Sequence, residues 1–117
     1  MGEDIIEGIL LQHKCNFKRE FKFDDCIGPK GVAYRFDFAV LDDNNNLKFL
    51  IEFDGRQHYT GPEADWKNTR TLEEIKAADD FKNSYCKQNG LILKRIPYWQ
   101  ISKINFKSLM DNTFNVI

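Results

Sequence analysis

Two apolar segments joined by a short polar turn constrain the fold of this chain more than any other feature. In residues 34–41 and 47–54, apolar and polar side chains alternate with the two-residue period of a β-strand. The segment between them, DDNNN at residues 42–46, has the composition of a tight polar turn. Strands joined by so short a turn pair antiparallel. The sequence therefore predicts a β-hairpin over residues 34–54.

The register of this hairpin brings acidic side chains together. With the centre of the turn near Asn44–Asn45, facing residues have numbers that sum to about 89, so Asp37 faces Glu52. The alternation agrees, because it places Asp54 on the same face as these two acids. The opposite face is expected to carry the apolar residues Phe36, Phe38, Val40, Phe49, Ile51 and Phe53.

Acidic side chains that face each other in a hairpin are destabilising unless a cation lies between them. Facing side chains have Cβ atoms about 4.5–5.5 Å apart, where like charges are destabilising. Hard divalent ions such as Mg²⁺ bind through one or two carboxylates and leave the remaining positions to water and phosphate oxygens. Asp37, Glu52 and Asp54 are therefore candidate metal ligands. The alternative is a solvated polar face in which Arg35 neutralises part of the charge.

The remaining segments add helices and two further strands. Residue spacing and breakers predict helices over residues 3–14, 71–88 and 100–110, strands over 17–23 and 91–96, and a loop over 24–31. Residues 60–70 fit no element clearly. The order αβββαβα predicts an α/β fold with a mixed central sheet flanked by helices. A length of 117 residues fits one domain over residues 1–117.

Three charged residues on the predicted helices are further candidates for the site of the hairpin acids. On a helical wheel, Asp79 and Lys82 fall inside the apolar stripe of the helix at 71–88, whereas Asp80 falls outside it. They form either a structural ion pair or part of a site facing the cleft of the hairpin acids. Glu3 lies at the edge of the buried face of the first helix, where it either joins the site or complements the helix dipole.

A histidine lies shortly after the second strand of the hairpin. In the stretch IEFDGRQHY, His58 comes four residues after Asp54 and can reach the same cleft. Imidazole titrates near neutrality and serves as a general acid or base. A histidine on the surface of a loop is the alternative interpretation. We treat His58 as a candidate catalytic residue.

Composition says more about where in the cell the protein is expected to be than about what it does. The net charge of −1 does not by itself indicate a nucleic-acid binder, although a nuclease with an acidic site can have such a charge. No apolar run is long enough to cross a bilayer, and MGEDIIEGIL lacks the basic start of a secretion signal. The three cysteines form no CxxC pair, which is typical of reduced thiols. We expect a cytoplasmic protein, in a phage- or bacteria-like setting, without membrane contact.

Several stretches together resemble a known group of nucleases. The run GEDIIEGIL…YRFDFAVL…LIEFDGRQHY…DDFKNSYCKQNGLILKRIPYW is similar to small endonucleases of the PD-(D/E)XK superfamily. Within that superfamily it resembles the branch of the very-short-patch-repair endonucleases, which includes phage homing endonucleases with an E-D-x-H-D constellation. The resemblance covers nearly the whole chain and implies a restriction-endonuclease-like αβββαβα core.

The resemblance also implies roles for particular residues. It implies an Mg²⁺ site, in which Mn²⁺ also serves, held by Asp37, Glu52 and Asp54. The implied catalytic residues are Glu3, Asp37, Glu52, His58, Asp79 and Lys82. Asp80 is the alternative to Asp79 in this resemblance, and the helical wheel favours Asp79. Contacts to DNA are expected from Arg56, Gln57, Lys18, Arg19 and Lys22. The chain departs from the superfamily pattern at Asp54, where E-x-K would place a lysine. Gln57, His58 or Lys82 does the work of that lysine, or the work is not needed.

The function implied in this way is metal-dependent hydrolysis of phosphodiester bonds in DNA, by a homing or repair endonuclease. The alternatives are a non-catalytic DNA- or protein-binding module on the same fold, and a resolvase for branched DNA. DNA is the expected partner. A homodimer or a separate DNA-recognition domain are the two ways in which so small a domain would read a sequence.

Overall fold

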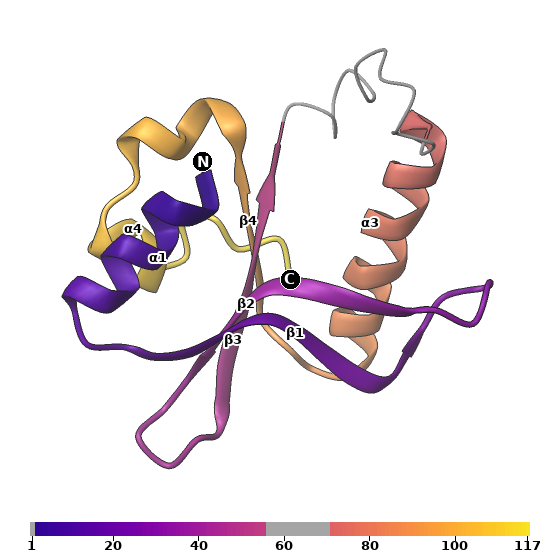
Figure 1. The fold of residues 1–117 in the computed structure, drawn as a ribbon, viewed down its shortest axis with the longest axis horizontal. Helices are drawn as coiled ribbons and strands as arrows, with labels where there is room; N and C mark the ends of the chain where they lie inside the picture. The colour runs from indigo at the N-terminus through magenta and orange to yellow at the C-terminus, as the bar shows by residue number, and fades with distance from the viewer. Residues whose placement is uncertain (1, 56–70) are drawn as a thin grey trace.

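The computed structural model describes residues 2–55 and 71–117, which form a four-stranded mixed sheet with helices on both faces (Figure 1). In chain order the elements are α1 Gly2–Gln12, β1 Asn16–Ile27, β2 Ala33–Leu41, β3 Leu47–Asp54, α3 Leu72–Gln88, β4 Leu93–Pro97, the 3₁₀ helix η1 Tyr98–Lys103 and α4 Phe106–Met110. The predicted α/β class, with a mixed sheet and flanking helices, is confirmed.

The sheet has the strand order β1-β2-β3-β4. β2 pairs antiparallel with both β1 and β3, and β3 pairs parallel with β4. A parallel pair needs a crossover connection, and α3 provides a helix for it. α1 and α4 lie on one face of the sheet and α3 on the other (Figure 1). We call these the α1 face and the α3 face.

The hairpin of β2 and β3 has the predicted register. Phe38 pairs with Ile51 and Val40 pairs with Phe49, and the register shifts by one residue only next to the turn. The Asp42 side chain stabilises that turn, because its Oδ1 accepts hydrogen bonds from the backbone N–H groups of two asparagines, Asn44 and Asn46, at 2.8 and 2.9 Å. Short-range chemistry of this kind is why the register could be predicted from the sequence.

One residue of the hairpin lies on the face opposite to the predicted one. Phe38 packs with the α1 side, as expected, but Phe36 packs with the α3 side, so the prediction that they share a face is wrong. The ladder between β1 and β2 pairs the residues on either side of Glu20 and Asp37 but not these two. Glu20 has a φ of 50°, a left-handed conformation that interrupts the regular pleat. This distortion lets β2 change faces at Asp37.

Two element boundaries also differ from the prediction. β1 continues to Ile27, so the predicted loop over 24–31 begins later, and Cys26 is fully buried at the end of the strand. The predicted helix over 100–110 is divided into η1 and α4, because Asn105 begins a new helix with a capping box. α3 also begins with a capping box, from Thr71, close to the predicted start.

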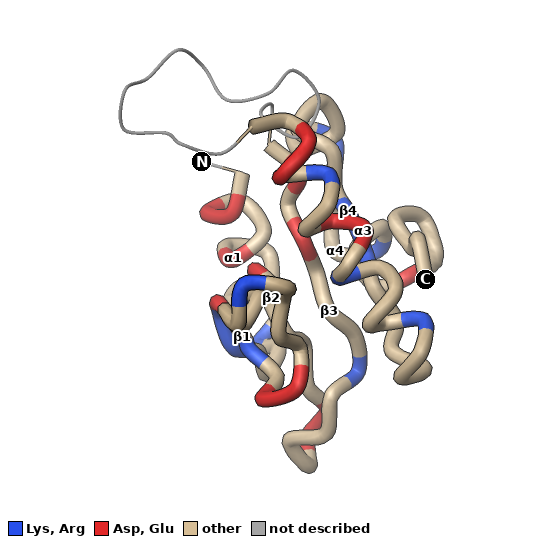
Figure 2. The backbone as a smooth tube through the Cα atoms, turned by 90° about the vertical axis from the view of Figure 1, so that its right-hand side faces the viewer, with Lys and Arg blue, Asp and Glu red and all other residues tan. Residues whose placement is uncertain are grey.

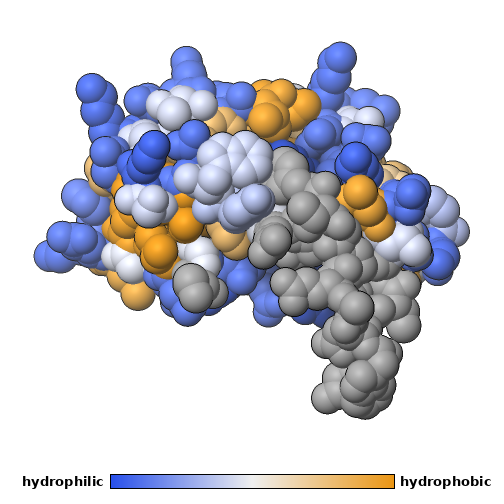
Figure 3. Space-filling view, turned by 90° about the horizontal axis from the view of Figure 1, so that it is seen from above, coloured by the Kyte–Doolittle hydropathy of each residue, from blue (hydrophilic) through white to orange (hydrophobic). Residues whose placement is uncertain are grey.

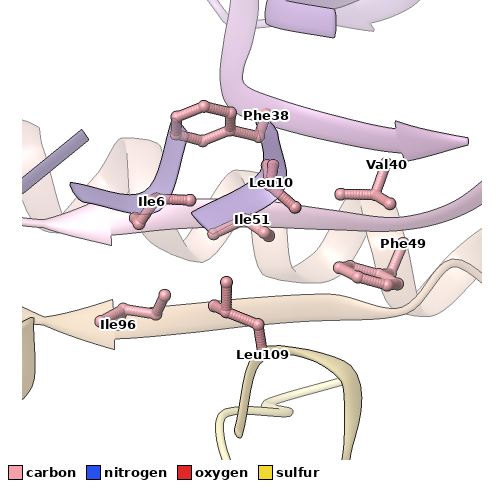
Figure 4. Packing of buried hydrophobic residues seen from close by; sticks show 8 residues of the cluster. All are labelled: Ile6, Leu10, Phe38, Val40, Phe49, Ile51, Ile96 and Leu109. Atoms are coloured by element: carbon pink, nitrogen blue, oxygen red, sulfur yellow. The ribbon is translucent and has the colours of Figure 1, made fainter. Parts of the chain in front are cut away.

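The core has two parts, one on each face of the sheet. Figure 4 shows the cluster on the α1 face, which consists of Ile6, Leu10, Phe38, Val40, Phe49, Ile51, Ile96 and Leu109. The cluster on the α3 face consists of Cys26, Phe36, Ala39, Leu50, Cys86 and Leu93. All three cysteines of the chain are free thiols.

The C-terminal residues run along the outer edge of β4. Backbone hydrogen bonds join Arg95 to Phe114 at 3.0 Å and Val116 to Leu93 at 2.9 Å. Buried Lys94 strengthens this attachment, since its Nζ donates to the carbonyl oxygen of Asp111 at 2.6 Å and to Oδ1 of Asn115 at 2.7 Å. Among the helices of residues 2–55 and 71–117, none has both the length and the apolar character of a membrane span.

Candidate active site on the α3 face of the sheet

The structure brings Asp37 and Glu52 together, as the hairpin register predicts. The Phe53 N–H donates to Oδ2 of Asp37 at 2.7 Å, which holds the carboxyl group at the end of the β2–β3 ladder. Burial raises the pKa of Asp37 to about 9, and the charge of Glu52 and a hydrogen bond between the two carboxyl groups act in the same direction. Asp37 therefore keeps its proton to a higher pH than an ordinary aspartate does.

Lys82 reaches this pair from α3. Its Nζ donates to Oε1 of Glu52, and the two side chains are only 14% and 6% exposed. The same ammonium group lies 5.5 Å from the centre of the Phe36 ring. Figure 2 shows the acidic positions of β3 beside α3, which carries both signs of charge. Lys82, one of the two charged residues in the apolar stripe of α3, thus meets a hairpin acid on the α3 face of the sheet.

A second charged group lies beside the first. Nη1 of Arg95, on β4, is 2.8 Å from Oδ1 of Asp54 and 3.4 Å from Oδ1 of Asp79. Its Nε donates to Oδ1 of Asn83 at 3.0 Å. Asp80, the alternative to Asp79, is exposed and lines a separate surface hollow. The helical wheel therefore selected the aspartate that faces the sheet.

Arg95 was not predicted as a residue of the site. The signal was present, because Lys94 and Arg95 are two basic residues within an otherwise apolar strand, LKRIP. Side chains of adjacent strand residues point to opposite faces. At most one of the two could have faced the acids, and which one depends on how β4 pairs with β3. Asn83 carried no sequence signal that we can identify.

Glu3 lies near the acid pair, and its charge contributes to the raised pKa of Asp37. The start of α1 packs tightly against β3 at this point. A Cβ atom added to Gly2 would lie 2.4 Å from the Phe53 ring, so a glycine allows the helix to approach. The approach places the first turn of α1 beside the residue whose N–H holds Asp37.

The predicted DNA contacts divide into three groups. Lys18 and Lys22 are exposed on β1. Arg19 forms a 3.6 Å ion pair with Glu7 and lies 5.0 Å from the centre of the Phe38 ring, so part of its charge is neutralised on the α1 face. Arg56 and Gln57 lie outside the described part of the chain, and so does His58, which is predicted as a catalytic residue and not as a DNA contact.

The donor atoms of the site fit a hard cation with few protein ligands. No group of three or more histidine, cysteine, aspartate or glutamate residues within residues 2–55 and 71–117 is placed to hold a metal ion. Asp37 and Glu52 supply carboxylate oxygens, and Mg²⁺ is commonly held by one or two carboxylates with water and phosphate oxygens around it. The side chain of Asp54, the third predicted ligand, is turned to Arg95.

Comparison with known proteins leaves the family of this chain open. No model of a known protein family matches it. Neither a curated protein nor a solved structure matches it. The resemblance to the PD-(D/E)XK endonucleases therefore stays a prediction from the sequence motifs.

Proposed function

We propose that this protein is a metal-dependent DNA endonuclease with a restriction-endonuclease-like core. The observation that supports the proposal most directly is the Asp37–Glu52 pair, in which two carboxyl groups meet in a partly buried place and the charge of Glu52 adds to the desolvation that raises the pKa of Asp37. Two carboxyl groups placed side by side cost stability unless a positive charge joins them. Because such a pair does not help the protein to fold, a role in function is the better explanation for it.

In the proposed reaction, Asp37 and Glu52 would hold Mg²⁺, or Mn²⁺ in its place, which would supply Lewis-acid polarisation of the scissile phosphate and a lowered pKa for a bound water. Lys82 places its ammonium group beside Glu52, where it stabilises negative charge on the phosphate and does the work of the E-x-K lysine. Glu3 orients the attacking water. His58 accepts the proton of that water or donates one to the leaving oxygen.

DNA is the proposed partner, held mainly through its phosphates by Lys18, Lys22, Arg56 and Gln57. Figure 3 shows the end of the molecule at which β3 and β4 finish, and the described surface there is largely hydrophilic with separate apolar patches. Such a surface suits a charged and hydrated ligand. We propose a cytoplasmic location, with a homodimer or a separate recognition domain to read sequence.

One observation favours a second candidate, a non-catalytic DNA- or protein-binding module. Lys82 pairs with Glu52, and Arg95 pairs with Asp54 and Asp79, so opposite charges within the protein compensate part of the acidic charge. In that case the acids are structural. A resolvase for branched DNA uses the same chemistry as the first proposal and differs in substrate.

The substitution Asp37→Asn separates the two candidates. It keeps the shape of the carboxyl group and removes the negative charge that Asp37 can carry beside Glu52, so in chelator the variant should melt at the wild-type temperature or higher. Mg²⁺ should stabilise the wild type by mass action, by about 2.7 kcal/mol at 100 times its dissociation constant, and the variant much less. Cleavage should fall at least about 10²-fold, as it does when one charge-stabilising group is removed.

The measurements are thermal melts with Mg²⁺ and with chelator, and cleavage of supercoiled, linear and branched DNA with Mg²⁺, Mn²⁺ and chelator. Asp43→Asn is the matched control, because Asp43 is an exposed acid in the turn of the same hairpin. It should behave as the wild type in every assay. An Asp37→Asn variant that is destabilised in both conditions and still cuts DNA would exclude this hairpin as a nuclease site.

A further inference from the structure

Arg95 is the most constrained charged side chain near the acids. It is 9% exposed, and its guanidinium group contacts three residues. Nη1 donates to Oδ1 of Asp54 and Oδ1 of Asp79, Nη2 donates to the carbonyl oxygen of Asp79 at 3.3 Å, and Nε donates to Oδ1 of Asn83. A guanidinium group is a planar fork whose donors have fixed directions. Its partners are therefore held in place together.

This contact changes what Asp54 is able to do. Asp54 shares a face with Glu52, so both carboxylates are candidates for the same ion. Binding an ion would require Asp54 to leave Arg95 or to bring a divalent cation against a buried guanidinium group. Either choice is costly, because like charges in a buried site repel strongly and a buried charge that loses a partner is destabilising.

Glu52 is in a different situation, although it is also paired. Its partner Lys82 carries a point charge on a flexible four-carbon stem and is 14% exposed. Such a side chain can move to a phosphate oxygen while Glu52 binds an ion. The two buried acids of β3 thus have partners of different kinds, one that can move and one that is fixed.

We propose that Arg95 is a positioning residue that holds Asp54 and Asp79 away from the metal, so that the site takes one divalent cation on Asp37 and Glu52. The inference rests on the proposed function, because it assumes that the acid pair binds metal. It assigns Asp54 and Asp79 to the attachment of α3 to the sheet. That attachment also sets the place from which Lys82 reaches Glu52.

The neighbouring residue provides a matched control. Lys94 is the other buried cation of β4, but its Nζ contacts a backbone carbonyl and an asparagine and lies 4.7 Å from the centre of the Phe49 ring, in the cluster of the α1 face. Removing Lys94 takes a buried positive charge from the same strand without touching the acids.

The test is the stoichiometry and affinity of Mn²⁺ binding, measured by calorimetry and by the electron paramagnetic resonance of free Mn²⁺. The wild type should bind one ion. Asp54→Asn should also bind one ion, with an affinity within about threefold, whereas Asp37→Asn should lose at least about tenfold, the lower end of what altering a metal site costs. Arg95→Met should bind a second ion, because it removes the guanidinium group that Asp54 and Asp79 contact.

Lys94→Met should lose stability and still bind one ion. If Arg95→Met does not fold, the comparison of Asp54→Asn with Asp37→Asn decides the question. A loss of binding in Asp54→Asn as large as that in Asp37→Asn would make Asp54 a ligand and overturn the inference while leaving the endonuclease standing. A second ion in Lys94→Met would also overturn it. A wild type that binds no Mn²⁺ would remove the proposed function and this inference together.

Discussion

The two faces of the sheet bury side chains of different kinds, although the same strands supply both. On the α1 face eight apolar residues form one cluster, and the buried charge beside it, Lys94, has uncharged oxygens as hydrogen-bond partners. On the α3 face the apolar cluster is smaller and lies beside four charged side chains that pair with one another: Glu52, Asp54, Lys82 and Arg95. Alternation along a strand is enough to separate the two kinds of environment.

The difference shows how a small protein can contain a costly site. Apolar burial contributes roughly 25 cal/mol for each Å² removed from water, and it does so without a geometric requirement. A buried ion pair contributes little net stability, because desolvation offsets the attraction. We infer that apolar burial, in the larger cluster of the α1 face and the smaller one of the α3 face, supplies more of the folding free energy than the buried ion pairs do. The α3 face can then hold groups that are chosen for binding or chemistry.

The largest expected effect compares two phenylalanines on opposite faces. Phe38 and Phe36 are both fully buried and are separated only by Asp37. Replacing either with alanine should cost about 3–5 kcal/mol, measured by urea unfolding in chelator. Only Phe36→Ala should also weaken Mn²⁺ binding, because the ammonium group of Lys82 lies over that ring. Equal losses of Mn²⁺ affinity in both variants would mean that the two faces are not independent.

A smaller effect is the pH dependence that the α3 face adds. Asp37 has a pKa of about 9 in the folded protein, against 3.8 for the ordinary side chain, so between these values the folded state binds a proton that the unfolded state has lost. In chelator, stability should therefore fall as pH rises from 4 to 9. The slope from this one group can reach about 1.4 kcal/mol per pH unit.

Urea unfolding at pH 5, 7 and 9 would measure this slope, with Asp37→Asn as the variant that lacks the group. The variant should show a flatter profile over the same range. Because the ion competes with the proton, stabilisation of the wild type by Mg²⁺ should grow as pH rises. A wild type whose stability in chelator changes between pH 5 and pH 9 in the same way as that of the variant would contradict the raised pKa of Asp37.

The smallest expected effect concerns the helix caps on the two faces. Thr71 begins α3 and Asn105 begins α4, each with a capping box. Alanine at either position should cost about 1 kcal/mol of stability, measured by thermal or urea unfolding. Neither substitution should change Mn²⁺ affinity, since Asp79 and Lys82 lie beyond the first turn of α3. A clear loss of affinity in Thr71→Ala alone would show that the site depends on the start of α3.

What could be predicted from the sequence was local. The turn and the alternation fixed the meeting of Asp37 with Glu52, and the helical wheel selected Asp79 over Asp80. The face of Phe36 could not be predicted, because it depends on a left-handed residue, Glu20, in the neighbouring strand. The role of Arg95 depends on how β4 pairs with β3. The two strands are distant in sequence, so no local pattern predicts this pairing.

The segment that follows α4 has a consequence for how the protein behaves at high concentration. A strand at the edge of a sheet exposes backbone donors and acceptors that can pair with another molecule. Residues 114–117 form hydrogen bonds with several backbone groups of β4. The Lys94 side chain also donates hydrogen bonds to this C-terminal segment. A chain without these four residues would present a short apolar edge to its neighbours. Loss of the tail should therefore lead first to association between molecules, along the strand that carries Arg95.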